Sequence, residues 1–148
     1  VSRILTMSQT GNEIIAIESD TSFLKHYKTI IITPDIFCST PQIYKHYDEI
    51  GRPTHSGISV PKEFETLTDN FHNDLEISAL DITPQLNDFK KHIESISDLV
   101  FMVAGSGSSI FCILDNDKAQ NQYLHLKNAL QNELIHEKIR QLAISTIC

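Results

Sequence analysis

Several residue types are scarce in this sequence, and the shortages exclude whole classes of protein. There are only five glycines and five prolines among 148 residues, and no low-complexity tract. The three cysteines, Cys38, Cys112 and Cys148, show no CxxC motif and no paired Cys/His spacing. Such a set argues against a disulfide framework and against a zinc site. It predicts a reducing compartment, which we interpret as the cytoplasm.

Positive charge is also in short supply. The chain has 12 Lys and Arg against 19 Asp and Glu, a formal net charge of −7. A protein that binds a nucleic-acid backbone or an anionic membrane needs a basic face, so we expect neither partner. No apolar run approaches the ~20 residues of a membrane-spanning helix, and Val1–Met7 is too short for a signal peptide.

Length and composition fit one globular domain over residues 1–148, with 41% hydrophobic and 21% charged residues. The sequence begins at Val1 rather than at an initiator methionine. This start fits a fragment or a processed piece, from which functional parts could be missing, and leaves open a stand-alone domain.

Local patterns predict strands and helices that alternate along the chain. Period-2 and β-branched runs predict strands at Arg3–Met7, Glu13–Glu18, Thr29–Thr33, Leu99–Ala104, Ser109–Leu114 and Ile139–Ile147. Gly11-Asn12 suits the turn of a hairpin within residues 1–20. The run Thr29–Thr33 predicts a strand buried on both faces.

Helix signals fill the segments between these strands. Thr40-Pro41 and Thr83-Pro84 each offer a capping threonine followed by a proline suited to the first helical turn. The other predicted helices are Pro61–Asn70, one beginning at Asn73-Asp74-Leu75-Glu76, and Asp115–Asn132. The helix from Thr83 to about Ser95 has an apolar stripe of Leu86, Phe89, Ile93 and Ile96. The predicted fold class is α+β, an antiparallel or mixed sheet with helices packed on one face.

The segment VAGSGSSIF, residues 103–111, places two of the five glycines in a polar turn between apolar runs. It lacks the lysine of a phosphate-binding GxxxxGK[ST] loop and the third glycine of a dinucleotide fingerprint. It leads into a strand, so we expect no helix N-terminus behind it. Backbone N–H groups there, with the hydroxyls of Ser106, Ser108 and Ser109, could form an anion-binding concavity. The alternative, which local sequence alone favours, is a plain hairpin turn.

Four segments, in order and in rough register, resemble the GHMP small-molecule kinases. Ala104–Phe111 fits their third glycine motif, and Asn73-Asp74-Leu75-Glu76 fits their NDLE helix start about 30 residues earlier. Thr10–Ile15 is similar to their G-x-GE-I segment, and Ile32–Tyr44 to their strand–Pro–Thr helix entry. The likeness spans about residues 4–130 and is strongest to kinases of the non-mevalonate isoprenoid pathway, which act on a cytidine diphosphate derivative of methylerythritol.

The resemblance covers only the C-terminal half of those kinases. Their main ATP loop, catalytic aspartate and N-terminal lysine have no counterpart here, so it implies no catalytic residue in this chain. ATP and Mg²⁺ would be bound mainly by the absent N-terminal half, which the hairpin of residues 1–20 would border. This chain also departs from the family at Ala104, where Ser or Thr is usual, and at Gly11-Asn12-Glu13, where Arg-Gly-Glu is frequent.

The resemblance also assigns candidate site residues. It implies that Thr40, Pro41 and Tyr44 contribute to a cytidine pocket, and Tyr44 lies one helical turn from Thr40. Without the resemblance, Tyr44 is better interpreted as a core aromatic. The loop of Gly105, Ser106, Gly107, Ser108 and Ser109 would approach the transferred phosphate or the methylerythritol end of the substrate.

Other polar clusters have structural interpretations. The seven histidines show no metal-ligand spacing. His72 beside Asn73-Asp74 could form a His–Asp pair, but a helix-capping cluster is favoured, and Asp115–Asp117 are interpreted as a helix cap. Cys112 is expected to be buried and inert. The competing functions are a non-catalytic α+β module that binds a small anion or a partner subunit, and a GHMP kinase with another substrate.

Overall fold

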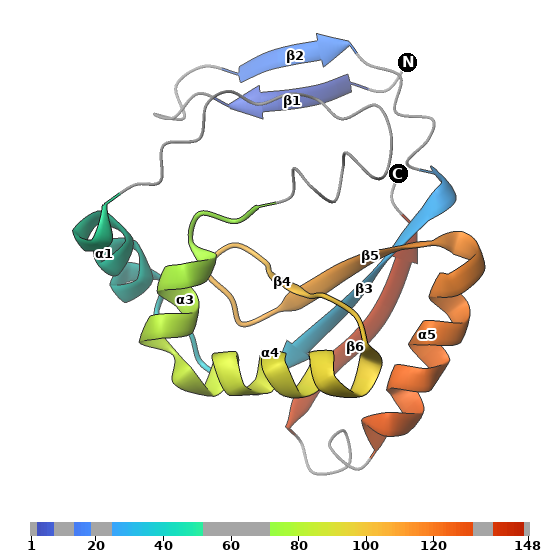
Figure 1. The fold of residues 1–148 in the computed structure, drawn as a ribbon. Coiled ribbons are helices and arrows are strands. Elements are labelled where there is room, and N and C mark those ends of the chain that lie inside the picture. Colours follow the sequence, from blue (N-terminus) through green and yellow to red (C-terminus); the bar gives the residue numbers. More distant parts are fainter. Residues whose placement is uncertain (1–2, 8–13, 19–24, 52–71, 132–137, 147–148) are drawn as a thin grey trace.

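The strands form two antiparallel sheets (Figure 1). A computed structural model describes residues 3–7, 14–18, 25–51, 72–131 and 138–146. Its strands are β1 (Arg3–Met7), β2 (Ile14–Glu18), β3 (Tyr27–Pro34), β4 (Met102–Val103), β5 (Ile110–Asp115) and β6 (Ile139–Thr146). Strands β1 and β2 pair with each other, and the other four form a sheet in the order β4-β5-β3-β6. The predicted antiparallel sheet, including the last strand, is confirmed.

Strand β3 is central, but its two faces differ. Ile30, Ile32 and Pro34 are buried, whereas the residues between them are half-buried. The register places Ile30 opposite Cys112 and Ile32 opposite Ile110, so these side chains share one face of the sheet. The prediction of burial on both faces was therefore wrong. The β-branched run marks a central strand, but only one face receives the helices.

Among the described residues, four helices accompany the larger sheet, α1 (Thr40–Ile50), α3 (Glu76–Ile82), α4 (Pro84–Ser97) and α5 (Asn116–Ala129). Helix α5 packs on β3 and β5, α3 lies beside β4 at the edge of the sheet, and α1 packs on α3. Buried Leu86 and Ile93 of α4 and Leu126 of α5 join Ile30 and Ile32 in one core cluster. The α+β fold class predicted from the sequence is confirmed.

The helix starts differ in detail from the sequence-based expectation. The N-cap of α1 is Ser39, one residue before Thr40, and its side chain makes no capping hydrogen bond. Thr83 is the N-cap of α4 and Asp115 that of α5, again without a side-chain bond. The prolines do lie in the first turns of α1 and α4, where their missing N–H costs nothing. The capping hydroxyl predicted for Thr40 is instead directed to another part of the chain.

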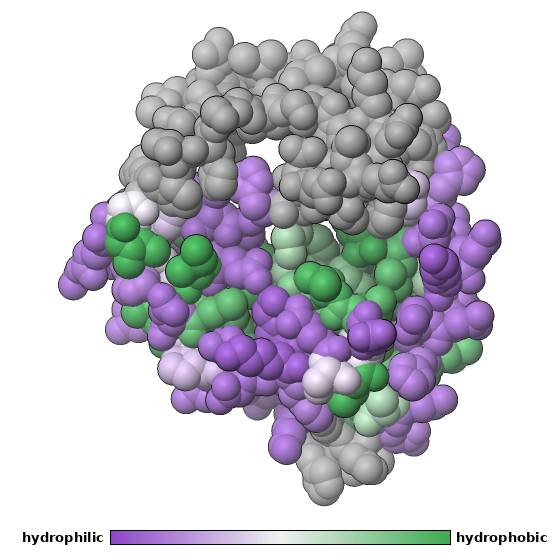
Figure 2. Space-filling model, in the orientation of Figure 1, coloured by the Kyte–Doolittle hydropathy of each residue, from purple (hydrophilic) through white to green (hydrophobic). Residues whose placement is uncertain are grey.

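The hydropathy of the surface differs between the parts of the molecule (Figure 2). Hydrophilic residues dominate along α5 and the outer side of α4, with hydrophobic patches over β4 and β5 and near α1 and α3. Exposed hydrophobic side chains in that region are Phe37, Tyr44, Ile50, Ile77 and Ile82. The predicted helix Pro61–Asn70 and turn Gly11-Asn12 lie outside the described residues, as does Cys148.

Candidate functional site

The glycine segment forms a tight connection between β4 and β5. Ala104 N–H donates to the Ser109 carbonyl at 2.8 Å, and Gly107 N–H donates to the Ala104 carbonyl at 2.9 Å. Gly105 and Gly107 have φ angles of 58° and 85°, in the left-handed region that favours glycine. The loop is thus a hairpin turn, and whether it also binds a ligand depends on what surrounds it.

The two glycines meet different surroundings. A Cβ at Gly105 would have no neighbour within 4 Å. A Cβ at Gly107 would lie 3.0 Å from Leu86 Cδ2 and 3.1 Å from Cys38 Sγ. Gly107 therefore presses the loop against the core, while Gly105 leaves open space above the backbone. Burial raises the pKa of the Cys38 thiol, against a smaller lowering effect of a hydrogen bond with Thr83, so this wall of the loop is uncharged.

The start of α1 lies against the glycine loop. Thr40 Oγ1 and Ser106 Oγ are 2.8 Å apart, in an exposed hydrogen bond between residues 66 positions apart in the sequence. The expectation that no helix N-terminus stands near the loop was therefore wrong. The helix is not the one that follows the loop in sequence but one that the fold brings beside it. An α-helix N-terminus carries unpaired N–H groups and a partial positive charge.

The other two loop hydroxyls are engaged with the end of β3. Ser109 Oγ and Thr33 Oγ1 are 2.9 Å apart, and Ser108 Oγ donates to the Pro34 carbonyl at 3.4 Å. These bonds tie the loop to the strand that leads into α1. Ser106 is then the loop serine whose hydroxyl lies beside α1 and solvent, while Ser108 and Ser109 support the loop from below.

The loop offers backbone donors as well. Within the part of the chain that the structure describes, no backbone acceptor is bonded to the N–H groups of Gly105, Ser106 or Ser108. A short row of such N–H groups with small side chains is an arrangement that binds anions. Together with the start of α1, these groups can stabilise a bound phosphate through hydrogen bonds and a partial positive charge, without any lysine or arginine.

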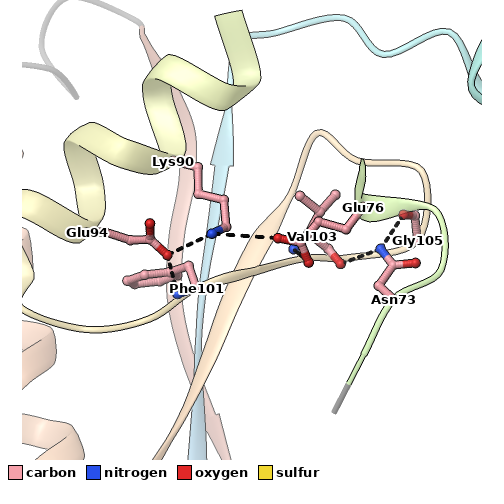
Figure 3. Close-up of polar contacts among 7 residues, drawn as sticks. All are labelled: Asn73, Glu76, Lys90, Glu94, Phe101, Val103 and Gly105. Atoms are coloured by element: carbon pink, nitrogen blue, oxygen red, sulfur yellow. Dashed lines mark hydrogen bonds and ion pairs between the residues drawn. The ribbon is translucent and has the colours of Figure 1, made fainter. Parts of the chain in front are cut away.

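Asn73 holds the other side of the loop (Figure 3). Its Nδ2 donates to the carbonyls of Val103 at 2.8 Å and Gly105 at 2.7 Å, and its Oδ1 accepts from Leu75 N–H at 3.1 Å. A cavity of about 460 Å³ opens beside it, lined by His72, Asn73, Asp74, Met102, Val103, Gly105 and Phe111. The loop therefore borders the cavity at Gly105 and contacts α1 at Ser106.

Tyr44 and Pro41 are exposed on α1, and Tyr44 retains 51% of its surface. That exposure contradicts the interpretation of Tyr44 as a core aromatic. One turn further along, Tyr47 Oη donates to Asp74 Oδ2 at 3.4 Å, and His72 Nε2 lies 3.7 Å from Asp74 Oδ1. The loose His–Asp pair thus exists, whereas Leu75 rather than His72 or Asp74 is the N-cap of α3.

Lys90 connects α3 and α4 beneath the site (Figure 3). Its Nζ lies 2.8 Å from Glu94 Oε1 and 3.6 Å from Glu76 Oε1, and its side chain is 15% exposed. The same carboxylates accept outward N–H groups of β4 and of the residue before it, Glu76 from Val103 at 3.4 Å and Glu94 from Phe101 at 2.9 Å. These bonds satisfy a sheet edge that would otherwise present unpaired groups.

The described residues contain no group of three or more His, Cys, Asp or Glu side chains placed to hold a metal ion. No described helix combines the length and the apolar character that crossing a membrane requires.

Known proteins resemble this chain in sequence and in fold. No family profile matches it. The 4-diphosphocytidyl-2-C-methyl-D-erythritol kinase of Desulfotalea psychrophila is 29% identical over 101 residues, covering 66% of this chain and 34% of the relative. The kinase of the same name from Protochlamydia amoebophila is 34% identical over 91 residues, covering 61% of this chain and 30% of the relative.

A solved structure of a kinase of this kind is also similar to this chain in fold. A crystal structure of 4-(cytidine 5'-diphospho)-2C-methyl-D-erythritol kinase matches 80% of this chain and 43% of its own, with a TM-score of 0.52 and 21% identity, a likeness of fold. This chain is similar to the C-terminal part of these kinases. It spans about a third of the length of the curated kinases that it matches.

The loop and Thr40 were predicted from the sequence as separate parts of a site, and the residues that join them to the rest of the site were not assigned to it. These are Cys38, Tyr47, His72, Asn73 and Asp74. Asn73 and Asp74 stood in the NDLE motif that carried the resemblance to the kinases, and that motif was the one available signal. It marked a helix start, but nothing local indicated that Asn73 would bond to the loop.

Proposed function

We propose that this chain is the substrate-contacting C-terminal part of an ATP-dependent kinase that phosphorylates 4-diphosphocytidyl-2-C-methyl-D-erythritol in non-mevalonate isoprenoid biosynthesis. The observation that carries the proposal is the hydrogen bond between Thr40 and Ser106. It joins the helix entry and the glycine loop, two of the segments that resemble such kinases, into one continuous surface. The whole kinase would transfer the γ-phosphate of ATP to a hydroxyl of the methylerythritol unit.

In this proposal, the exposed Tyr44 ring stacks on the cytosine base. Base–aromatic stacking contributes about 1–3 kcal/mol, and it needs an accessible ring, which Tyr44 has. Thr40 and Pro41 form the wall of the pocket at the start of α1. The Thr40 hydroxyl, now bonded to Ser106, can exchange that partner for a polar group of the ligand.

The phosphate end of the ligand is proposed to lie over Gly105–Ser109. Unpaired N–H groups of the loop and the partial positive charge at the start of α1 suit a phosphate oxygen. In phosphoryl transfer, fixed donors of this kind stabilise negative charge as it spreads over the transferred group. At the loop itself the cavity is lined by the neutral groups of Asn73 and Gly105, while Asp74, whose carboxylate lies 3.7 Å from His72 Nε2, is the acidic residue of the same lining.

The described residues fit a phosphate group but not a metal ion. The loop carries N–H and hydroxyl groups and no carboxylate, so it does not suit Mg²⁺. We assign Mg²⁺ and most of the ATP contacts to the missing N-terminal half, and no residue of this chain is assigned a catalytic proton transfer. The chain alone is therefore expected to bind ligand without phosphorylating it.

The missing half is the proposed partner of this chain. Exposed hydrophobic side chains on α1 and α3, such as Ile50 and Ile77, supply a surface for it. The hairpin of β1 and β2, which is separate from the larger sheet, is proposed to border it. We propose that residues 1–148 act as one domain of this cytoplasmic kinase.

The proposal is tested by calorimetric titration of the chain with cytidine diphosphate, with uridine diphosphate alongside. We expect saturable binding that prefers cytidine, and weakening by about 1–3 kcal/mol in Tyr44→Ala. Since Tyr44 is half exposed, the thermal unfolding of this variant should change little.

Tyr44→Phe is the matched variant, because it keeps the ring and removes only the hydroxyl. It should retain most of the affinity. Equal binding by wild type and Tyr44→Ala would refute the cytidine pocket. Binding of inorganic pyrophosphate as strong as that of cytidine diphosphate would favour the non-catalytic anion-binding module.

A further inference from the structure

We propose that Asn73 is the positioning residue of the glycine loop, the group that aims its N–H donors at a ligand. The inference rests on the proposed function for the identity of the ligand. Its structural part, that Asn73 sets the loop conformation, stands on the contacts of Asn73 alone.

The side-chain amide of Asn73 donates two hydrogen bonds and accepts one. The two carbonyls that it binds are those of Val103, in β4, and Gly105, in the loop that follows, with N···O distances of 2.8 and 2.7 Å. Its oxygen accepts from Leu75 N–H at the entry to α3. An amide is the side chain that can donate twice and accept at the same time. The Asn73 side chain is therefore hydrogen-bonded both to the start of α3 and to the start of the loop (Figure 3).

The direction of these bonds determines what the loop can offer. A peptide unit is planar, with its C=O and N–H on opposite sides. When Asn73 holds the Gly105 carbonyl toward α3, the N–H of Ser106 in the same peptide unit points away from Asn73. That N–H belongs to the residue whose hydroxyl contacts Thr40. Fixing one carbonyl thus fixes the donor that faces the proposed ligand.

Gly105 makes such an anchor necessary. Its φ of 58° lies in the left-handed region, and no atom outside the neighbouring residues would come within 4 Å of a Cβ there. Packing does not hold this residue, and glycine has the widest conformational freedom of all residues. Beside the turn bond from Gly107 N–H to the Ala104 carbonyl, the hydrogen bond from Asn73 is the contact that holds the Gly105 carbonyl itself.

The segment that carries Asn73 is itself bonded to β4 and to α4 through Glu76. Glu76, three residues after Asn73, accepts from Val103 N–H and lies 3.6 Å from the Lys90 ammonium. Asn73 and Glu76 thus hold the carbonyl and the N–H of the same residue of β4. A shift of Asn73 relative to the loop would have to break the bonds of Glu76 as well.

The experiment compares Asn73→Asp with wild type in the full 148-residue chain. Aspartate keeps the shape and the acceptor for Leu75 N–H, but it cannot donate to two carbonyls. The backbone amide NMR signals of Gly105, Ser106 and Gly107 should shift or broaden, while that of Gly51, at the far end of α1, stays in place. The affinity for cytidine diphosphate should fall about tenfold or more.

Asn116→Asp is the matched control. Asn116 Nδ2 also donates to a backbone carbonyl, that of Lys25 at 3.0 Å, but at the end of β5 remote from the loop. This variant should leave the loop signals and the affinity unchanged. If Asn73→Asp fails to fold, Asn73→Ala removes the donors without introducing charge. In wild type, the side-chain amide protons of Asn73 should exchange slowly with solvent.

The outcomes separate this inference from the proposed function. Unchanged loop signals in Asn73→Asp and Asn73→Ala, or fast exchange of the Asn73 amide protons in wild type, would overturn the positioning role. Loop signals that move while cytidine diphosphate still binds at wild-type strength would also overturn it. If wild type binds no cytidine diphosphate, the proposed function fails, and the loop signals alone decide whether Asn73 sets the conformation.

Discussion

At the scale of single residues, the two loop glycines share a positive φ but have different surroundings. Both have positive φ, so an added Cβ costs about 1–2 kcal/mol at either position. Only at Gly107 would the Cβ also crowd Leu86 and Cys38, at 3.0 and 3.1 Å. A substitution by alanine therefore adds only backbone strain at Gly105, but backbone strain and crowding at Gly107.

We predict that Gly107→Ala destabilises the chain by about 2–4 kcal/mol and Gly105→Ala by about 1–2 kcal/mol. Denaturant unfolding of both variants measures the difference. Gly105→Ala is the better probe of binding, because open space surrounds its Cβ. Equal destabilisation would mean that the loop does not press on the core as described.

Cys112 gives the fold a pH dependence. Burial raises the pKa of its thiol from 9.0 to about 12, against a smaller lowering effect of a backbone hydrogen bond with Ile30. The unfolded chain therefore loses this proton near pH 9, while the folded chain keeps it. The stabilisation is fully present below pH 9 and is lost as the pH rises toward 12.

We predict that the free energy of unfolding of Cys112→Ala falls less steeply than that of wild type between about pH 8 and about pH 10.5. The slope, not the starting stability, is the quantity to compare, because the lost side chain lowers stability at every pH. Cys112→Val, which fills more of the space, should show the same shallow slope. Parallel curves for wild type and both variants would contradict the assignment.

Sequence alone identified many of these residues but not their contacts. Gly105, Gly107, Thr40 and Tyr44 were named because turn chemistry, capping preference and the resemblance to the kinases are local signals. The bond between Thr40 and Ser106 joins residues 66 positions apart. No propensity or periodicity encodes such a contact, so the merging of the two candidate sites could not be predicted.

At the scale of elements, β4 is a short strand whose outer edge is satisfied by helices rather than by another strand. Phe101 and Val103 donate to Glu94 and Glu76, and Lys90 balances the two carboxylates. The apolar stripe of α4 was predictable, since Leu86 and Ile93 recur at helical spacing and are buried. The polar residues between them gave no sign that they would bind a strand.

We predict that Lys90→Met lowers the free energy of unfolding by about 1–3 kcal/mol, because it leaves two partly buried carboxylates without their cation. Lys45→Met is the matched control. Lys45 also has a glutamate four residues on, Glu49 at 3.8 Å, but both side chains are more than half exposed. That variant should change stability by less than about 0.5 kcal/mol. Urea unfolding compares the two, and similar losses would show that the Lys90 cluster does not hold β4.

At the scale of the whole molecule, the site is assembled from parts that are distant in sequence. Segments around Thr40, Asn73 and Ser106 meet because α1, α3 and the hairpin of β4 and β5 pack at one end of the sheet. The α+β class followed from the order of strands and helices. The strand order did not, since it depends on which distant strands pair. The chain spans about a third of the length of the curated kinases that it matches.

The central position of β3 has a consequence for how the protein is made. Its neighbours are β5 and β6, and Lys28 pairs with Thr146, about 120 residues further along. At synthesis rates of about 5–20 residues per second, β3 waits roughly 6–24 s on the ribosome before that partner exists. During this time, the hydrophobic run Thr29–Thr33 has no completed sheet to enter, and it is the segment that a nascent-chain chaperone would need to shield.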